Sequence, residues 1–101
     1  MTKVFVESND NFINKVSIKG HSGYAESGSD IVCSSISGAV EVTIRMLEKV
    51  EGVIFDINED NASIIIEVTQ PNSFTNDCLG ALLGFLNDLS LMYEKFLKIY
   101  R

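Results

Sequence analysis

The chain is poor in the residues that most often carry metal or redox chemistry. Its 101 residues contain one histidine, His21, and two cysteines, Cys33 and Cys78, with no Cys-x-x-Cys pair. One histidine and two cysteines cannot complete a four-ligand zinc site without carboxylates, so we expect no metal. A P-loop is excluded as well, because no glycine is followed by lysine and then serine or threonine. We therefore expect a protein that works without a cofactor.

Basic residues and long apolar runs are also scarce. Eight lysines and arginines stand against fourteen acidic residues, which gives a net charge of −6 and a pI near 4.6. This charge opposes binding of nucleic acid and favours a basic protein partner. No apolar run approaches the roughly 20 residues of a membrane span, so we expect a cytoplasmic protein that does not bind membranes. Thiols stay reduced in the cytoplasm, so both cysteines are expected to be free.

Apolar residues, by contrast, are plentiful. They make up 46% of the chain, which is enough for one core and predicts a single domain over residues 1–101. Alternating apolar and polar residues predict strands, and apolar spacings of three and four predict helices. The expected elements are strands over 2–8 and 12–19, a helix from 32 that Gly52 ends, strands over 53–58 and 62–69, and a helix over 73–100. The fold class is α+β, with two β-hairpins each followed by a helix (ββαββα), and with the helices packed on a mainly antiparallel sheet.

The last predicted helix carries more apolar surface than one sheet needs. Two apolar stripes run along it, and they consist of Cys78, Leu82, Phe85, Leu89, Met92, Phe96 and Ile99, and of Leu79, Leu83, Leu86, Tyr93, Leu97 and Tyr100. We expect the second stripe, with Leu86 and Tyr93 facing the partner, to be buried in a homodimer. A broad intramolecular face is the alternative.

One segment concentrates the reactive side chains. Cys33 stands at the predicted start of the first helix, where free backbone N–H groups and the helix dipole favour a thiolate. His21 lies twelve residues earlier, and the glycines between them let the loop fold back. A thiol beside an imidazole suffices for nucleophilic catalysis, because the imidazole takes the thiol proton and later returns it. The segment predicts a small cysteine peptidase.

Each of these residues also has a plainer interpretation. Cys33 would be a core filler and His21 a surface histidine; Cys78, on an apolar stripe, is interpreted as such a filler. Asp30 stands three residues before Cys33, which is the spacing of a helix N-cap, and we favour that role over orientation of His21. The backbone N–H groups of Cys33 and Ser34 are candidates for an oxyanion hole. A thiol redox sensor remains an alternative, although it would want a resolving cysteine nearby.

The segment also resembles a known family signature. Gly20-His21, the glycine-bearing spacer, Asp30-Ile31-Val32-Cys33 and Ser37-Gly38-Ala39-Val40 are similar to the ribosomal-processing cysteine protease family, Prp. The resemblance implies a catalytic dyad of His21 and Cys33 supported by Asp30, in a homodimer. It implies as substrate the N-terminal extension of the large-subunit ribosomal protein twenty-seven, a basic protein, removed after paired phenylalanines. This sequence has Ser22 where alanine commonly follows the histidine, and Ser34-Ser35 where alanine or glycine usually follows the cysteine.

The loop over residues 20–29 is expected to act as a lid on the substrate. Its glycines lower the barrier to rearrangement, and substrate contacts must offset the entropy lost when the loop orders. We expect the loop to be mobile without substrate and ordered around an extended peptide, with Gly20, Ser22, Gly23 and Gly28 in the substrate loop. A noncatalytic module that docks on a ribosomal protein is the alternative function.

Overall fold

The computed structural model describes residues 1–26 and 28–101 and contains five strands and two helices in them. Their order along the chain is β1 (Thr2–Asn9), β2 (Phe12–Lys19), α1 (Ile31–Leu47), β3 (Val53–Asn58), β4 (Ser63–Val68), α2 (Ser73–Met92) and β5 (Leu97–Tyr100). The strands form one sheet in the order β3-β4-β2-β1-β5, with every pairing antiparallel except that of β1 with β5. The expected α+β fold with a mainly antiparallel sheet is confirmed.

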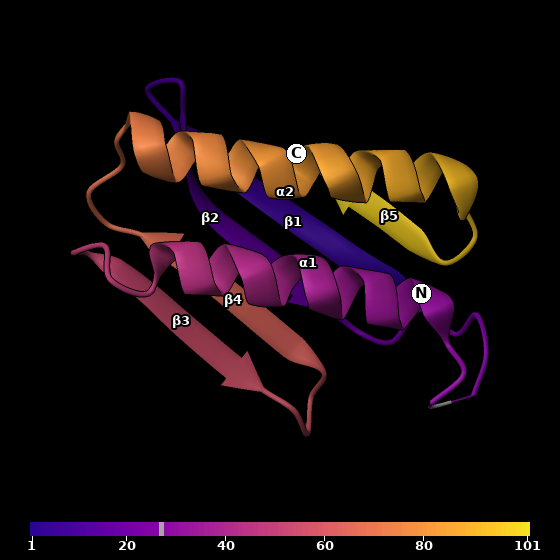
Figure 1. Cartoon of the computed structure of the whole chain (residues 1–101). Helices are drawn as coiled ribbons and strands as arrows, with labels where there is room; N and C mark the ends of the chain where they lie inside the picture. Colours follow the sequence, from indigo (N-terminus) through magenta and orange to yellow (C-terminus); the bar gives the residue numbers. More distant parts are fainter. Residues whose placement is uncertain (27) are drawn as a thin grey trace.

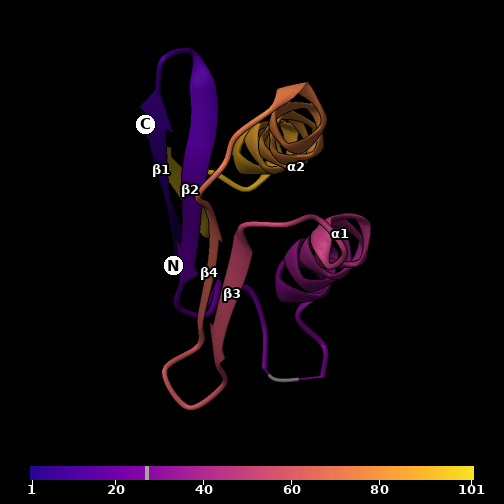
Figure 2. The same cartoon turned by 90° about the vertical axis from the view of Figure 1, so that its left-hand side faces the viewer.

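Both helices lie on the same face of the sheet, as Figures 1 and 2 show. The topology explains this arrangement. Each helix connects two parallel strands that are not neighbours: α1 joins β2 to β3, and α2 joins β4 to β5 in the opposite direction across the sheet. Because β2 and β4 are antiparallel, two crossovers of the same hand that run in opposite directions place their helices on one face. No helix within residues 1–26 and 28–101 covers the other face of the sheet (Figure 2).

The core lies between the sheet and the helices. Alternate residues at the start of β1 are buried, including Val4, as strand geometry requires. In β2, Val16 and Ile18 are buried with it. In α1 the predicted stripe of Ile36, Val40, Thr43 and Leu47 is buried. β4 lies between β3 and β2, which agrees with its run of three isoleucines.

The helix α1 ends five residues earlier than predicted. It stops at Leu47, and residues 48–52 form turns instead of a last helical turn. Gly52 belongs to the chain reversal into β3, where its φ is +82° and an added Cβ would lie 2.7 Å from Thr69 Oγ1. The glycine is therefore required by the turn and by the close approach of Thr69 and does not cap a helix.

The predicted helix over 73–100 is wrong in its last part. α2 ends at Met92; the N–H of Tyr93 bonds to the Leu89 carbonyl, and a turn leads into β5. The four residues from Leu97 to Tyr100 then pair with the free edge of β1 in parallel. This edge offers backbone hydrogen bonds that only the tertiary structure provides, and Leu97 is buried against the core. Neither helix of the described chain is both long enough and apolar enough to cross a membrane.

The second apolar stripe of α2 is not free for a partner. Leu79, Leu83 and Leu86 are all buried within the chain, and Leu86 is 0% exposed. The interpretation of Leu86 as a residue that faces a second copy is therefore wrong. Because the two helices lie side by side, a broad face of α2 packs against both the sheet and α1, and Leu86 belongs to this face. Val42 and Met46 of α1, which the sequence also favoured for the partner surface, are exposed, as is Phe85 of the first α2 stripe.

Candidate active site

Cys33 lies in the first turn of α1, held there by Asp30. Asp30 is the N-cap residue, and its Oδ1 accepts a hydrogen bond from the Cys33 N–H at 2.9 Å. The Ser34 N–H donates to the Asp30 carbonyl at 3.0 Å. Both N–H groups that were candidates for an oxyanion hole therefore already have acceptors, as an N-cap requires.

The second carboxylate oxygen of Asp30 holds the loop that precedes the helix. Oδ2 accepts hydrogen bonds from the Ser22 hydroxyl at 2.5 Å, from the Tyr24 N–H at 3.1 Å and from the Ala25 N–H at 3.4 Å. Burial by itself raises the pKa of Asp30, but the hydrogen bonds from Ser22, Cys33 and Ala25 outweigh it and lower that pKa to about 2. The side chain is thus an ionised acceptor at neutral pH.

Ser22 connects this carboxylate to the thiol. Its side chain is almost completely buried, at 1% exposure. The Ser22 N–H donates to Cys33 Sγ at 3.3 Å, and Sγ lies 3.4 Å from Ser22 Oγ in hydrogen-bonding geometry. The prediction placed Ser22 in the substrate loop and missed these contacts. The only signal in the sequence is a serine next to the lone histidine, where the resembling family commonly has alanine.

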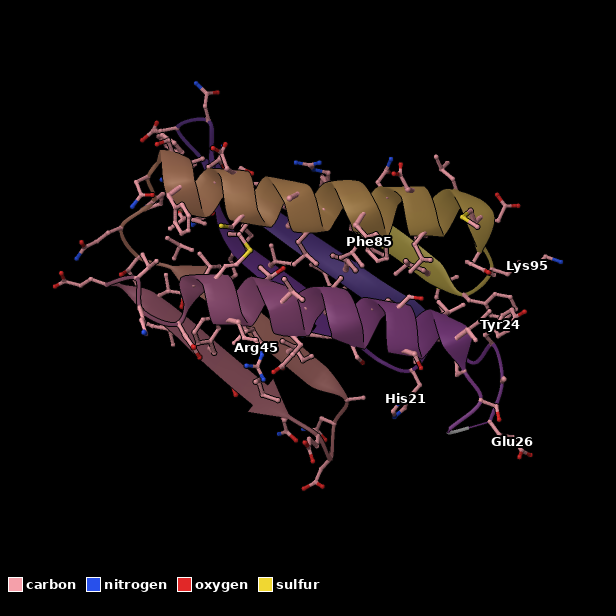
Figure 3. All side chains as sticks on the ribbon, in the orientation of Figure 1. His21, Tyr24, Glu26, Arg45, Phe85 and Lys95 are labelled. Atoms are coloured by element: carbon pink, nitrogen blue, oxygen red, sulfur yellow. The ribbon has the colours of Figure 1, made fainter. Side chains whose placement is uncertain are left out.

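His21 lies in the loop after β2. Its exposed side chain is near the N-terminal part of α1 (Figure 3). The preceding Gly20 has a φ of +86°, and an added Cβ there would lie 3.0 Å from the Met1 carbonyl oxygen. Gly20 is tied to neighbouring elements by its N–H, which donates to the Ala62 carbonyl at 2.8 Å, and by its carbonyl, which accepts from the Thr2 hydroxyl. Among the hydrogen bonds of the described residues, none joins His21 to Cys33 or to Asp30.

His21 and Cys33 nevertheless line the same two clefts. The first cleft, of about 340 Å³, continues between α1 and the β3–β4 turn. Its walls are Thr2, Ile18, Gly20, Ile36, Ser37, Ile57, Asn58, Glu59, Ala62, Ser63 and Ile64. The residues from β3 and its turn were not predicted, because they lie far along the chain and only sheet pairing brings them here.

The second cleft lies on the loop side of the thiol. It measures about 510 Å³, and besides His21 and Cys33 its walls are Gly23, Ala25, Gly28, Asp30, Ser34 and Ser37. The loop glycines Gly23 and Gly28 both have positive φ and open space where a Cβ would be. The two clefts meet at Cys33, so an extended chain can pass over the thiol from one cleft to the other.

Aromatic contacts hold the loop against the turn between α2 and β5. The Tyr24 ring meets the rings of Tyr93 and Phe96 edge to face, with centroids 5.5 Å and 5.3 Å apart. Tyr93 and Phe96 lie in the turn between α2 and β5. The first half of the loop is therefore held both by Asp30 and by an aromatic cluster. Residue 27 of the predicted lid lies outside the described residues.

Cys78 has none of the surroundings of a nucleophile. It is buried on α2, where burial raises the pKa of its thiol and the Asp77 carboxylate adds to the effect. Cys33 is half-buried and borders two clefts. No group of three or more histidine, cysteine, aspartate or glutamate side chains within residues 1–26 and 28–101 is arranged to hold a metal ion.

Comparison with known proteins gives a family and a set of folds. Residues 1–98 match the sequence profile of the family described as cysteine protease Prp. No curated protein sequence matches. A crystal structure of an essential ribosomal processing protease Prp from S. aureus, with a covalently linked product peptide, superposes with a TM-score of 0.86 at 23% identity and covers 98% of this chain and 97% of that one.

Two further structures share the fold. SMU.848 from Streptococcus mutans has a TM-score of 0.82 at 21% identity, over 98% of this chain and 91% of that chain. The S. aureus protease in complex with a substrate peptide has a TM-score of 0.75 at 21% identity, over 99% and 98% of the two chains. The ribosomal activity named for the S. aureus enzyme belongs to that protein.

Proposed function

Because this chain belongs to the cysteine protease Prp family and is a cysteine protease, we propose that it removes the N-terminal extension of the large-subunit ribosomal protein twenty-seven. Cys33 is the nucleophile and His21 the general base in this proposal. The observation that carries it is the position of Cys33, at the start of α1 and at the meeting point of two clefts that His21 also lines. The alternative of a noncatalytic module does not account for a thiol placed between two clefts.

The proposed reaction has two halves. In the first, His21 takes the thiol proton, Cys33 Sγ bonds to the scissile carbonyl carbon, and the amide nitrogen leaves with the proton from His21. In the second, His21 takes a proton from water while the water oxygen bonds to the thioester carbon. The C–S bond then breaks and Sγ recovers the proton from His21. The released extension leaves as a carboxylic acid, which loses its proton to solvent. Asp30 contributes by holding the helix start and the His21-bearing loop, which supports the dyad without touching the histidine.

The substrate class follows from the first cleft and from the charge. Ile18, Ile36 and Ile57 give this cleft an apolar wall that suits phenylalanine side chains before the scissile bond. A net charge of −6 attracts a basic ribosomal protein in the cytoplasm. The S. aureus relatives with bound substrate and product peptides are ribosomal processing proteases of the same fold, which supports this assignment.

We also propose that the enzyme is a homodimer through its helical layer. Val42 on α1 is 59% exposed, Met46 is 49% exposed, and Phe85 on α2 is 43% exposed. Phe85 lies on the outer side of this layer, next to α1 (Figure 3). These three side chains form the outer helical patch, which a second copy would cover.

The test is cleavage of a peptide that contains the ribosomal extension, followed by mass spectrometry. We expect one cut after the paired phenylalanines by the natural enzyme and none by Cys33→Ala. A peptide in which both phenylalanines are alanine should resist cleavage and so controls for the apolar cleft. Binding of the first peptide without any cut, at full enzyme concentration, would establish the noncatalytic module instead.

A further inference from the structure

The hydroxyl of Ser22 has all of its hydrogen-bonding capacity used. Oγ donates to Asp30 Oδ2 at 2.5 Å, accepts from the Tyr24 N–H at 3.3 Å, and lies 3.4 Å from Cys33 Sγ. A hydroxyl has one proton and two lone pairs, so one donated and two accepted hydrogen bonds complete it. Ser22 is buried, so water does not compete for these positions.

The direction of each bond follows from Asp30. Its carboxylate accepts four hydrogen bonds and has a pKa of about 2, so at neutral pH it can only accept. The single proton of the Ser22 hydroxyl must therefore point to Asp30. The same oxygen presents a lone pair to Cys33. A hydrogen bond between the two side chains therefore requires the proton to be on the sulfur.

We propose that Ser22 holds the thiol proton of Cys33 in the free enzyme, so that the nucleophile rests as a neutral thiol and is not yet paired with His21 as an ion pair. The Ser22 N–H donates a hydrogen bond to Sγ at 3.3 Å. The sulfur therefore accepts one hydrogen bond from Ser22 and donates another to it. The imidazole of His21 is exposed and has no hydrogen bond to Sγ within the described residues. Ser22 is thus a positioning residue that acts on both the sulfur and its proton.

The role in catalysis rests on the proposed function, whereas the position of the proton does not. When a peptide crosses from one cleft to the other, it covers His21 and Cys33 together. The S–H then turns from Ser22 Oγ to the imidazole, His21 becomes charged, and the sulfur attacks. The thiol is activated only when substrate is present, which protects it from oxidation and alkylation in the free enzyme.

The test measures the alkylation of Cys33 by iodoacetamide as a function of pH, without substrate. The Sγ–C bond forms as iodide leaves and the thiol proton passes to solvent, and peptide mapping separates Cys33 from Cys78. In Ser22→Ala the acceptor for the S–H is lost, so the rate near neutral pH should rise about three- to tenfold while the plateau rate at high pH stays unchanged. Ser35→Ala is the matched control, because its hydroxyl bonds to the Ile31 carbonyl and not to the site.

The comparison of neutral with high pH separates protonation from access. A rate gain at high pH as large as the gain near neutral pH would show that Ser22 only shields the sulfur, and would overturn the proposal. A second measurement needs no variant at Ser22: the ultraviolet thiolate absorbance of the natural enzyme at pH 7 should equal that of Cys33→Ala. Extra thiolate absorbance in the natural enzyme would also overturn it. A protein that fails to cleave the ribosomal peptide but shows both expected results would refute the proposed function alone.

Discussion

A single carboxylate organises the site at the scale of residues. Asp30 caps α1 with one oxygen and holds Ser22, Tyr24 and Ala25 with the other. The N-cap role was predictable, because an aspartate three residues before Cys33, at the predicted start of the helix, is a local signal. The second role was not, because it depends on how a glycine-bearing loop folds back in three dimensions.

The two cysteines should respond differently to removal. Cys33→Ala should abolish peptide cleavage and change the free energy of unfolding by less than about 1 kcal/mol, because the side chain is only half-buried. Cys78→Ala should retain cleavage per folded molecule and lose about 1 kcal/mol or more of stability, because it leaves a cavity in the core. Urea unfolding and a cleavage assay check both. Loss of cleavage in a folded Cys78→Ala would contradict the choice of nucleophile.

Replacement of the histidine should nearly match loss of the thiol. His21→Ala should lower kcat by about 10² to 10⁴, because proton transfer to the leaving amine then depends on water. The exposed side chain makes no hydrogen bond within the described residues, so stability should barely change. Steady-state cleavage and thermal unfolding measure the two effects. Near-normal cleavage by the folded variant would require another base.

Acid should weaken the fold through Asp30. Its pKa falls from an ordinary 3.8 to about 2 on folding, so the folded state holds the proton less tightly than the unfolded chain. The resulting stability is fully present above about pH 4 and is lost as the pH falls toward 2. Asp30→Asn keeps an N-cap but has no titrating carboxylate. Urea unfolding from pH 6 to pH 2 should show the gap between the natural protein and Asp30→Asn closing over this interval, and a constant gap would contradict the assignment.

At the scale of elements, the loop after β2 is built from two unlike parts. Ser22 to Ala25 is anchored on Asp30 and by Tyr24 on the α2–β5 turn. Gly28 has open space around its Cβ position. The lid hypothesis stays a prediction, but these contacts lead us to expect that the anchored part is already ordered in the free enzyme.

Hydrogen exchange at the anchored part should depend on the Tyr24 ring. Tyr24→Ala should lower the protection of the amides at positions 24 and 25 by about tenfold, because two edge-to-face contacts are lost. Tyr24→Phe keeps the ring and serves as the control. The measurement is repeated on a Cys33→Ala background with and without a noncleavable peptide. Peptide should restore protection in the Tyr24→Ala protein, and equal protection in every sample would remove both the anchor and the lid.

At the scale of the whole molecule, the crossover topology leaves one outer helical surface and one uncovered sheet face (Figure 2). The apolar side chains Val42, Met46 and Phe85 lie on the helical side. Three lysines, Lys3, Lys19 and Lys98, lie in register across neighbouring strands, and their alternation with buried residues places them on the uncovered side. Like charges would repel if two copies met through the sheet, which favours the helical layer as the surface of the proposed dimer.

A charge on the outer helical patch should separate the subunits without unfolding them. Phe85→Asp places a carboxylate where solvent is available in the monomer, so we expect a folded monomer by light scattering at micromolar concentration. Leu86→Asp, one residue later, buries an unpaired charge in the core and should unfold the chain. A natural protein that is already monomeric, or a Phe85→Asp protein that remains dimeric, would contradict the helical interface.

Local patterns in the sequence were sufficient for much of this protein. Periodicity located both hairpins and the start of both helices, and the N-cap spacing of Asp30 placed Cys33 at a helix start. These features depend on interactions between residues a few positions apart, which a sequence displays directly. The segment from Gly20 to Cys33 also carried enough of the family signature to identify the chemistry.

Only the tertiary structure decided the features that join distant segments. Residues 97–100 fit a helical stripe and a short strand equally well, and the free edge of β1 selected the strand. The second stripe of α2 is buried by the chain itself because α1 and the sheet lie against it. Likewise, the cleft wall from Ile57 to Glu59 and the bridge from Ser22 to Cys33 arise where separate elements meet. Such contacts depend on the packing of elements, which periodicity within one element does not encode.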